Sequence, residues 1–244
     1  MATSVVLVHG IRTSHTMWRA QVEDLERRGQ RVIAVDLPGH GTRRGEQFTL
    51  SGAFDTIDGA VQEASVDGPA LLVGHSMGGL LSLQYAADHP EAPLAGLVAA
   101  SCTALPRGAA LATYRLLARA LDSLPDRGFW LSERMLDATI PPETRGDFAA
   151  GGYALDAQDA ALSTLVGLDL ADAVRRLTLP LWFVNGQFDQ LRANERQFLR
   201  WAPHAELIVV PRTSHLVTAM RPAVFNAVLQ LATASVADSA PRTS

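Results

Sequence analysis

The chain has 244 residues, of which 48% are hydrophobic and 19% are charged, and its net charge is -4. This length and apolar content fit one sizeable globular domain with an insertion, and they exclude a disordered chain. All 21 basic residues are arginines, outnumbered by 25 acidic residues, so the chain has no basic field for nucleic acid or an anionic membrane surface. The single cysteine, Cys102, excludes an intrachain disulfide and a cysteine-rich zinc site.

From the N-terminal sequence we expect neither a signal peptide nor a membrane span. The N-terminal residues run directly into the apolar segment 5–8, without a basic leader or an apolar stretch long enough for a signal peptide or a membrane span. We therefore expect a cytoplasmic protein. Residues 235–244 are mostly small and polar and include a proline, so we expect them to form a flexible tail.

Short runs rich in Val, Leu and Ile recur along the chain, at 5–8, 32–35, 70–73, 94–99, 181–184 and 207–210. They lack polar alternation, as strands covered on both faces do, and they predict a mostly parallel six-stranded sheet. Helical patterns separate them, at 17–28, 50–64, 77–88, 193–201 and 223–234. This alternation predicts an α/β protein whose site lies at the carboxyl ends of the strands.

One interval is too long for a single crossover, because about 75 residues separate Cys102 from Leu179. Helical patterns fill it, at 109–124, 130–138, 142–149 and 156–177, the last broken near Gly167. The segment also holds more large apolar side chains than one connecting helix would bury. We therefore expect a helical cap over residues 105–177, inserted after the fourth strand into a core formed by residues 1–104 and 178–234.

The segment from Gly74 to Gly79 has the pattern of a nucleophile elbow. Ser76 follows a predicted strand and precedes a predicted helix, with glycines on both sides. Such a sharp turn holds the serine in strained backbone geometry and leaves no room for bulky neighbours. The alternative is a glycine-rich turn without a catalytic role, since the pattern is short.

A serine hydroxyl needs a base, and the base needs a partner that fixes its tautomer. His215 and Asp189 each follow a predicted strand, at the same edge of the sheet as Ser76. The order Ser, Asp, His along the chain is that of the nucleophile-elbow enzymes. Asp36, which closes the second strand, is the alternative acid. The remaining histidines fit capping, turn or core roles: His9, His15, His40, His75, His89 and His204.

Acyl transfer also requires donors for a developing oxyanion. The segment that follows the first strand places the Ile11 amide where it can face the Met77 amide across the site. Arg12 is an alternative donor through its charged side chain, although an exposed arginine is usually a solvated charge.

Together these residues resemble the α/β-hydrolase superfamily over residues 5 to about 231. The landmarks are the segments 5–10, 36–41 and 74–79, Leu179-Pro180 with Gly186 and Asp189, and His215 followed by Pro222. The resemblance implies a Ser76, Asp189, His215 triad and an oxyanion hole formed by the Ile11 and Met77 amides. It also implies a cap formed by the insertion, and no metal or organic cofactor.

Departures from related enzymes narrow the activity that the resemblance implies. Ser76 replaces the nucleophilic aspartate of epoxide hydrolases and haloalkane dehalogenases, and the chain has no lysine of the kind that hydroxynitrile lyases use. Leu216 stands where carbon-carbon bond hydrolases usually carry a tryptophan, and Ser214 replaces a common glycine. Cofactor-free oxygenases share the fold and remain an alternative.

We therefore expect a serine hydrolase that cleaves carboxylic esters of small to medium apolar substrates. The alternatives are a lactone or carbon-carbon bond hydrolase and a non-catalytic ligand-binding member of the fold. The partner is a small-molecule ester, and the sequence indicates no oligomeric state. Candidate pocket residues are Arg12, Trp18, Tyr114, Phe129, Trp130, Met135 and Leu216, which could equally pack the cap onto the core.

Overall fold

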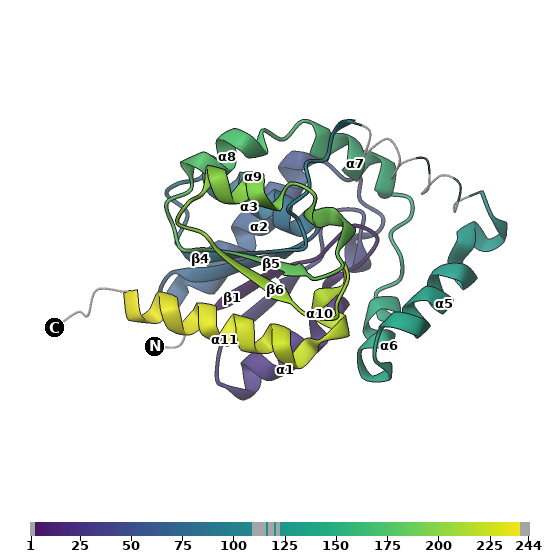
Figure 1. Ribbon diagram of the computed structural model, residues 1–244, viewed down its shortest axis with the longest axis horizontal. Helices are drawn as coiled ribbons and strands as arrows, with labels where there is room; N and C mark the ends of the chain where they lie inside the picture. The colour runs from purple at the N-terminus through teal and green to yellow at the C-terminus, as the bar shows by residue number, and fades with distance from the viewer. Residues whose placement is uncertain (1–2, 109–115, 117–119, 121–122, 240–244) are drawn as a thin grey trace.

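The computed structural model describes residues 3–108, 116, 120 and 123–239. Its centre is an open sheet of six parallel strands in the order β2-β1-β3-β4-β5-β6 (Figure 1). The strands are β1 (Val5–Val8), β2 (Val32–Val35), β3 (Ala70–His75), β4 (Leu94–Ala100), β5 (Leu181–Gly186) and β6 (Glu206–Val210). All six lie within two residues of the predicted bounds, and every residue of β1, β3 and β5 is buried. The prediction of a parallel six-stranded sheet is confirmed, whereas the edge strands β2 and β6 are only partly buried.

Helices cover both faces of this sheet. The helices of the core are α1 (Arg19–Arg27), α2 (Leu50–Ala64), α3 (Met77–Asp88), α9 (Glu195–Trp201), α10 (Val217–Met220) and α11 (Pro222–Ser239). Short 3-10 turns precede or follow them: η1 (His15–Trp18), η2 (Gly41–Arg43), η3 (Ser65–Asp67) and η5 (Gln190–Arg192). No helix among the described residues is long and apolar enough to cross a membrane.

The side chains of alternate residues along each strand pack into two separate apolar cores, one on each face of the sheet. On β3, Leu72 packs with α2 and α3, whereas Leu71 and Val73 pack on the opposite face, where Trp18 and Phe225 lie. This follows from the twofold alternation of side chains along a strand. In Figure 1, α1 and α11 lie on one side of the sheet and α2, α3 and α9 on the other. Both cores therefore pack against β3, the strand that leads into Ser76.

The strand order reverses direction at β1, because the chain passes from β1 outward to β2 and returns to the other side as β3. The connections after β1 and β3 consequently leave in opposite directions and open a crevice at the carboxyl ends of these strands. Ligands bind at such switch points in open parallel sheets. The chain segments after β1 and β3 are those that carry Ile11 and Ser76.

The insertion between β4 and β5 is helical in its described part. It contains η4 (Pro125–Gly128), α5 (Phe129–Thr139), α6 (Pro142–Ala150), α7 (Gln158–Val166) and α8 (Leu170–Arg176). The predicted break near Gly167 is present, and most of the helix predicted at 109–124 lies outside the described residues. In Figure 1, α5 and α6 stand to one side of the sheet, and α7 and α8 lie beside α3. The division into core and cap stays a prediction.

The α6 helix is attached to the core by side-chain contacts. The Arg19 guanidinium lies 3.0 Å from the Asp147 carboxylate, and the Thr144 hydroxyl donates to the Ala219 carbonyl at 2.9 Å. The Thr16 hydroxyl donates to the Asp147 carbonyl at 2.5 Å. These contacts tie the insertion to η1 and α10, both of which flank the carboxyl edge of the sheet.

The C-terminal helix is longer than predicted. We expected a flexible tail from residue 235, but α11 continues to Ser239. The reason is burial, because Val236 is only 5% exposed and packs against Gly96 of β4. The expectation is therefore wrong for residues 235–239, and the rest of the expected tail lies outside the described residues.

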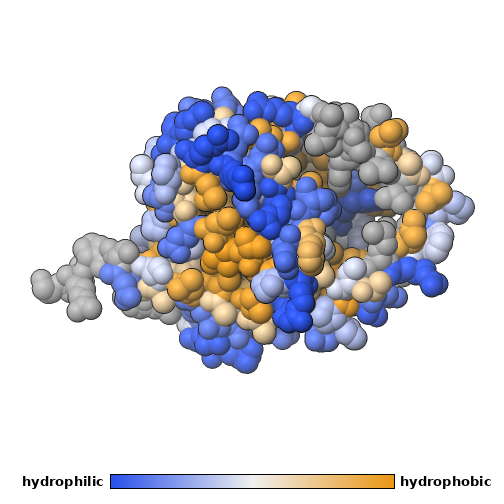
Figure 2. Space-filling view, viewed as in Figure 1, coloured by the Kyte–Doolittle hydropathy of each residue, from blue (hydrophilic) through white to orange (hydrophobic). Residues whose placement is uncertain are grey.

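The strands β2 and β6 form the two edges of the sheet, and β6 is the edge beside β5. Apolar side chains gather over this part of the surface in Figure 2, and Val209 is 37% exposed. The candidate site lies elsewhere, at the carboxyl ends of the strands.

Candidate active site

Ser76 occupies a sharp turn between β3 and α3. Its backbone has φ 54° and ψ -118°, a left-handed conformation that is unfavourable for a residue with a side chain. The flanking glycines make the turn possible: a Cβ on Gly74 would collide with the Gly78 backbone, and one on Gly78 would collide with the Val8 carbonyl. The turn predicted from the glycine pattern is present, and it aims the Ser76 side chain out of the sheet edge.

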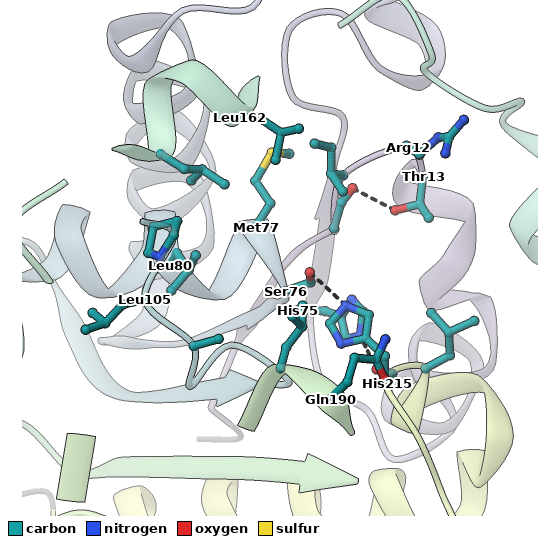
Figure 3. A pocket seen from close by; sticks show the side chains of 17 residues that line it. Arg12, Thr13, His75, Ser76, Met77, Leu80, Leu105, Leu162, Gln190 and His215 are labelled. Carbon is teal, nitrogen blue, oxygen red and sulfur yellow. Dashed lines mark hydrogen bonds between the residues drawn. The ribbon is translucent and has the colours of Figure 1, made fainter. Parts of the chain in front are cut away.

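The three predicted catalytic side chains lie in one hydrogen-bonded row. The Ser76 Oγ lies 2.9 Å from the His215 Nε2 (Figure 3). The His215 Nδ1 lies 3.1 and 3.2 Å from the two carboxylate oxygens of Asp189. Asp189 follows β5 and His215 follows β6, so three strand ends contribute one group each. Residues more than a hundred positions apart thus converge as expected from their places after strands.

Asp189 is held as a carboxylate. Burial alone would raise its pKa, but the hydrogen bond and charge of His215 and the Leu191 amide, which donates at 2.8 Å, outweigh it. The pKa of Asp189 therefore lies below its ordinary value. An ionised acceptor at Nδ1 keeps the proton of a neutral imidazole on that nitrogen, which leaves Nε2 free to accept the proton of Ser76.

Asp36, the alternative acid, has other partners. Its carboxylate accepts hydrogen bonds at 2.8 Å from the amide and ring Nδ1 of His15 and from the amide and hydroxyl of Thr42. These bonds join η1 to η2 and hold the loops after β1 and β2 together. The Asp36 carboxylate thus holds these two loops together, and Asp189 is the acid that contacts His215.

The loop after β1 approaches Ser76 closely. A Cβ on Gly10 would lie 3.2 Å from the Ser76 Cβ and 3.0 Å from the His75 Nδ1, so only a glycine fits there without displacement. Ile11 and Met77 both line the cavity beside Ser76. Met77 is the first residue of α3, where helical amides lack partners within the helix. The Ser76 amide, by contrast, is already bonded to the Ala100 carbonyl at 2.8 Å.

A cavity of about 250 Å³ opens beside Ser76. Aliphatic side chains form most of its wall: Ile11, Met77, Leu80, Ala104, Leu105, Pro106, Leu162, Leu165, Leu191 and Leu216. Polar side chains are confined to Arg12, Thr13, His75, Gln190 and the Ser76 and His215 pair. Among the described residues no cluster of His, Cys, Asp and Glu side chains is arranged to hold a metal ion. The site can therefore accommodate a largely apolar molecule next to a hydrogen-bonded serine.

The model of the alpha/beta hydrolase family matches residues 5–228 of the chain. The chain belongs to this family. A thermophilic esterase from Thermogutta terrifontis has a similar structure, with a TM-score of 0.75, 25% sequence identity, and coverage of 97% of this chain and 91% of that one. The fold and the match together establish the molecule as an alpha/beta hydrolase, as the sequence motifs predicted.

Curated relatives of this hydrolase match over shorter stretches. Monoglyceride lipase of Mus musculus is 27% identical over 182 residues, which is 69% of this chain and 59% of the lipase. The magnesium-chelatase 30 kDa subunit of Rhodobacter capsulatus is 35% identical over 124 residues, 50% of this chain and 42% of that subunit. The matches thus span less than two thirds of either relative, and the esterase and lipase similarities support a hydrolase without fixing its substrate.

Two of the predicted pocket residues of this hydrolase line the cavity, namely Arg12 and Leu216. Trp18 does not, because it is fully buried beneath the site, with its ring 6.0 Å from that of Phe225. Trp130 is 53% exposed on α5 and is absent from the cavity wall. The prediction is therefore wrong for both tryptophans. Tyr114 and the side chains of Phe129 and Met135 lie outside the described residues.

Apart from Leu216, the leucines of the wall were not named as pocket residues from the sequence, and neither was the part played by His75. The ring of His75 lies 5.1 Å from that of His215, and its Nε2–H donates to the His215 carbonyl at 2.9 Å. Burial lowers the pKa of His75 to about 3, so the ring is neutral. His75 thereby links the turn that carries Ser76 to the loop that carries His215. Its position inside the elbow motif was the one signal available in the sequence.

His9 also acts on the backbone of the site. The Leu37 amide donates to its Nε2 at 3.0 Å, which places the ring proton on Nδ1, where it donates to the Gly10 carbonyl at 2.8 Å. Burial lowers the pKa of His9 to about 3 and keeps the ring neutral. His9 thus fixes the orientation of the Gly10 peptide at the start of the loop that carries Ile11.

Proposed function

We propose that this hydrolase cleaves carboxylic esters of small to medium apolar substrates through an acyl-enzyme on Ser76. The observation that carries the proposal is the hydrogen-bonded row from Ser76 Oγ through His215 to Asp189 beside an aliphatic cavity. A strained serine whose hydroxyl faces an imidazole, itself oriented by a carboxylate, is suited to nucleophilic attack on a carbonyl carbon.

In the first half of the reaction, Ser76 Oγ attacks the ester carbonyl while the His215 Nε2 takes its proton. The oxyanion develops between the Ile11 and Met77 amides, at the N-terminus of α3, where the helix dipole also stabilises negative charge. Removal of one such donor typically costs about 2.7 to 4 kcal/mol of transition-state stabilisation. His215 then returns the proton to the leaving alcohol.

In the second half, His215 removes a proton from a water molecule as the water oxygen attacks the acyl carbon. The bond to Ser76 Oγ then breaks, His215 returns the proton to that oxygen, and the carboxylic acid is released. Asp189 holds the imidazole in place throughout and stabilises its charged form. We further propose that the insertion acts as a cap, because α7 supplies Leu162 and Leu165 to the cavity wall. The mechanism uses no cofactor.

The test compares two serines of the same region. Ser76→Ala removes the nucleophile, and we expect the kcat for p-nitrophenyl butyrate to fall by roughly 10⁴ to 10⁶-fold. Ser82→Ala is the matched control, since Ser82 is fully buried in α3 and is not a residue of the cavity wall. We expect the control to retain activity, as measured by release of p-nitrophenol.

Full activity in Ser76→Ala would overturn the proposed mechanism. A panel of esters, lactones and β-diketones, assayed with the unmodified protein, separates the ester reaction from its alternatives. Exclusive hydrolysis of lactones or of carbon-carbon bonds would replace the proposed substrate class. Binding of apolar ligands without turnover of any of these compounds would instead indicate a non-catalytic member of the family.

A further inference from the structure

The proposed reaction, on which this inference rests, divides the surroundings of Ser76 into three directions. In the tetrahedral intermediate the oxyanion points to the Ile11 and Met77 amides. The leaving oxygen must face the His215 Nε2, because that atom gives it a proton. The acyl chain takes the remaining direction, away from His215. In Figure 3 this is the side of Leu80 and Leu105, opposite His215 and Gln190.

The wall on this side is aliphatic. Met77 and Leu80 come from consecutive turns of α3, Leu162 and Leu165 come from consecutive turns of α7, and Leu105 comes from the segment after β4. Met77, Leu80, Leu162 and Leu165 are each at most 6% exposed. None of these five side chains can compensate a buried charge, so this side favours an uncharged hydrocarbon chain.

A thin partition closes this side of the cavity. Leu105 and Pro106 line the cavity beside Ser76, and they also line a second, small hollow of about 10 Å³. The rest of that hollow is formed by Arg107, Val166, Leu168, Asp169, Leu170 and Ala171, at the turn between α7 and α8. Val166 is 47% exposed, so the hollow lies near the surface. The Leu105–Pro106 segment therefore lies between the acyl side of the cavity and this small hollow.

The partition is fixed in place by the start of α9. The Leu105 amide donates to the Asn194 Oδ1 at 3.0 Å, and the Asn194 amide donates to the Thr103 carbonyl at 3.0 Å. The Arg107 amide donates to the Leu105 carbonyl at 2.8 Å, which turns the chain sharply at Pro106. These bonds fix the backbone of the Leu105–Pro106 segment beside the cavity.

We propose that Leu105 is the residue that limits acyl chain length, and that the preferred substrates are esters of aliphatic acids whose uncharged chain ends against this side chain. Chains longer than the distance from Ser76 to Leu105 cannot be buried without displacing the partition. Shorter chains leave part of the aliphatic wall unfilled and lose about 0.8 kcal/mol for each methylene not buried, roughly a fourfold change in kcat/KM.

The experiment measures kcat/KM for p-nitrophenyl esters from acetate to dodecanoate. Leu105→Ala joins the cavity to the small hollow, and we expect the optimum to move to chains at least two methylenes longer. For an acyl chain two methylenes longer than the original optimum, kcat/KM relative to that of the original optimum should rise roughly 15-fold. Leu105→Phe fills the end of the cavity and should move the optimum to shorter chains. Leu199→Ala is the matched control: Leu199 is likewise half-buried but is absent from the cavity wall, and its profile should not move.

A second series keeps the acyl group constant, as butyrate, and varies the alcohol from methanol to octanol. The Leu105 variants should leave this profile unchanged. A shift of the alcohol profile with no shift of the acyl profile would overturn the assignment of the two sides. An acyl optimum that stays in place in both Leu105 variants would overturn the role of Leu105.

A binding measurement separates this inference from the proposed chemistry. Calorimetry with unbranched alkanoic acids, from butanoate to dodecanoate, is performed on Ser76→Ala with and without Leu105→Ala. We expect the tightest-binding acid to be longer in the double variant. If the protein hydrolysed no ester but this shift was seen, the chain-length limit would stand and the proposed function would fail. Identical binding profiles in the two variants would contradict the limit itself.

Discussion

The backbone of Ser76 is strained, and the same turn directs its hydroxyl toward His215. A non-glycine residue with its backbone geometry costs of order 1 to 3 kcal/mol, and the surrounding structure must impose that geometry. Two backbone hydrogen bonds of Ser76 impose this geometry. Its amide donates to the Ala100 carbonyl at 2.8 Å, and its carbonyl accepts from the Leu80 amide at 3.1 Å. The strained turn is thus held between β4 and the first turn of α3, with the hydroxyl directed at His215.

Loss of the Asp189 carboxylate should lower the turnover number far more than it lowers the stability of the fold. We expect Asp189→Asn to lower kcat by roughly 10⁴-fold, because the amide no longer guarantees the tautomer in which Nε2 accepts the serine proton. Asp55→Asn, an exposed substitution of the same kind on α2, is the control. Steady-state kinetics with p-nitrophenyl butyrate, together with thermal melting, checks both variants. Turnover of Asp189→Asn within tenfold of the unmodified protein would contradict the role assigned to the carboxylate.

At the scale of elements, the sheet was predictable because its central strands are buried on both faces and its edge strands are also apolar runs. Continuous apolar runs mark such strands directly, and the switch in strand order then brings the ends of β1 and β3 together. The end of α11 was missed because small residues such as Ala and Ser give little periodic signal. The burial of Val236 against β4 depends on a contact more than a hundred residues away in sequence.

The cavity wall was not predictable from the same reasoning. Leu80 and Leu162 look like ordinary core leucines in sequence, and the direction in which each points depends on how α3 and α7 pack. Most of the side chains predicted to line the pocket were large aromatic ones, yet Trp18 packs in the core and Trp130 is exposed. Motifs that impose a backbone geometry can be read from one chain, whereas side chains that line a cavity are chosen by tertiary packing.

At the scale of the whole molecule, neutral histidines buried beneath the site make its stability depend on pH. Burial lowers the pKa of both His9 and His75 to about 3, whereas an unfolded histidine has a pKa of about 6.5. As the pH falls below about 6.5, the unfolded chain takes up protons that the native protein does not, so the free energy of unfolding decreases. Asp189, whose pKa is lowered, adds a loss in the same direction as the pH falls through its native pKa.

We therefore expect chemical denaturation between pH 4 and 8 to show falling stability toward acid. Each buried neutral histidine contributes a slope of up to about 1.4 kcal/mol per pH unit below about pH 6.5. His75→Gln removes one of these groups and should make the profile shallower. His204→Gln, the same substitution at an exposed position, is the control. A slope in His75→Gln equal to that of the unmodified protein would show that His75 does not remain neutral in the fold.

The attack of Ser76 on an electrophile is tested most directly by covalent labelling with a fluorophosphonate, followed by peptide mass spectrometry. We predict one adduct per chain, located on the Ser76 side chain, with labelling abolished in Ser76→Ala and greatly slowed in a variant that lacks the His215 imidazole. An adduct on another residue, or labelling that persists in Ser76→Ala, would contradict the account.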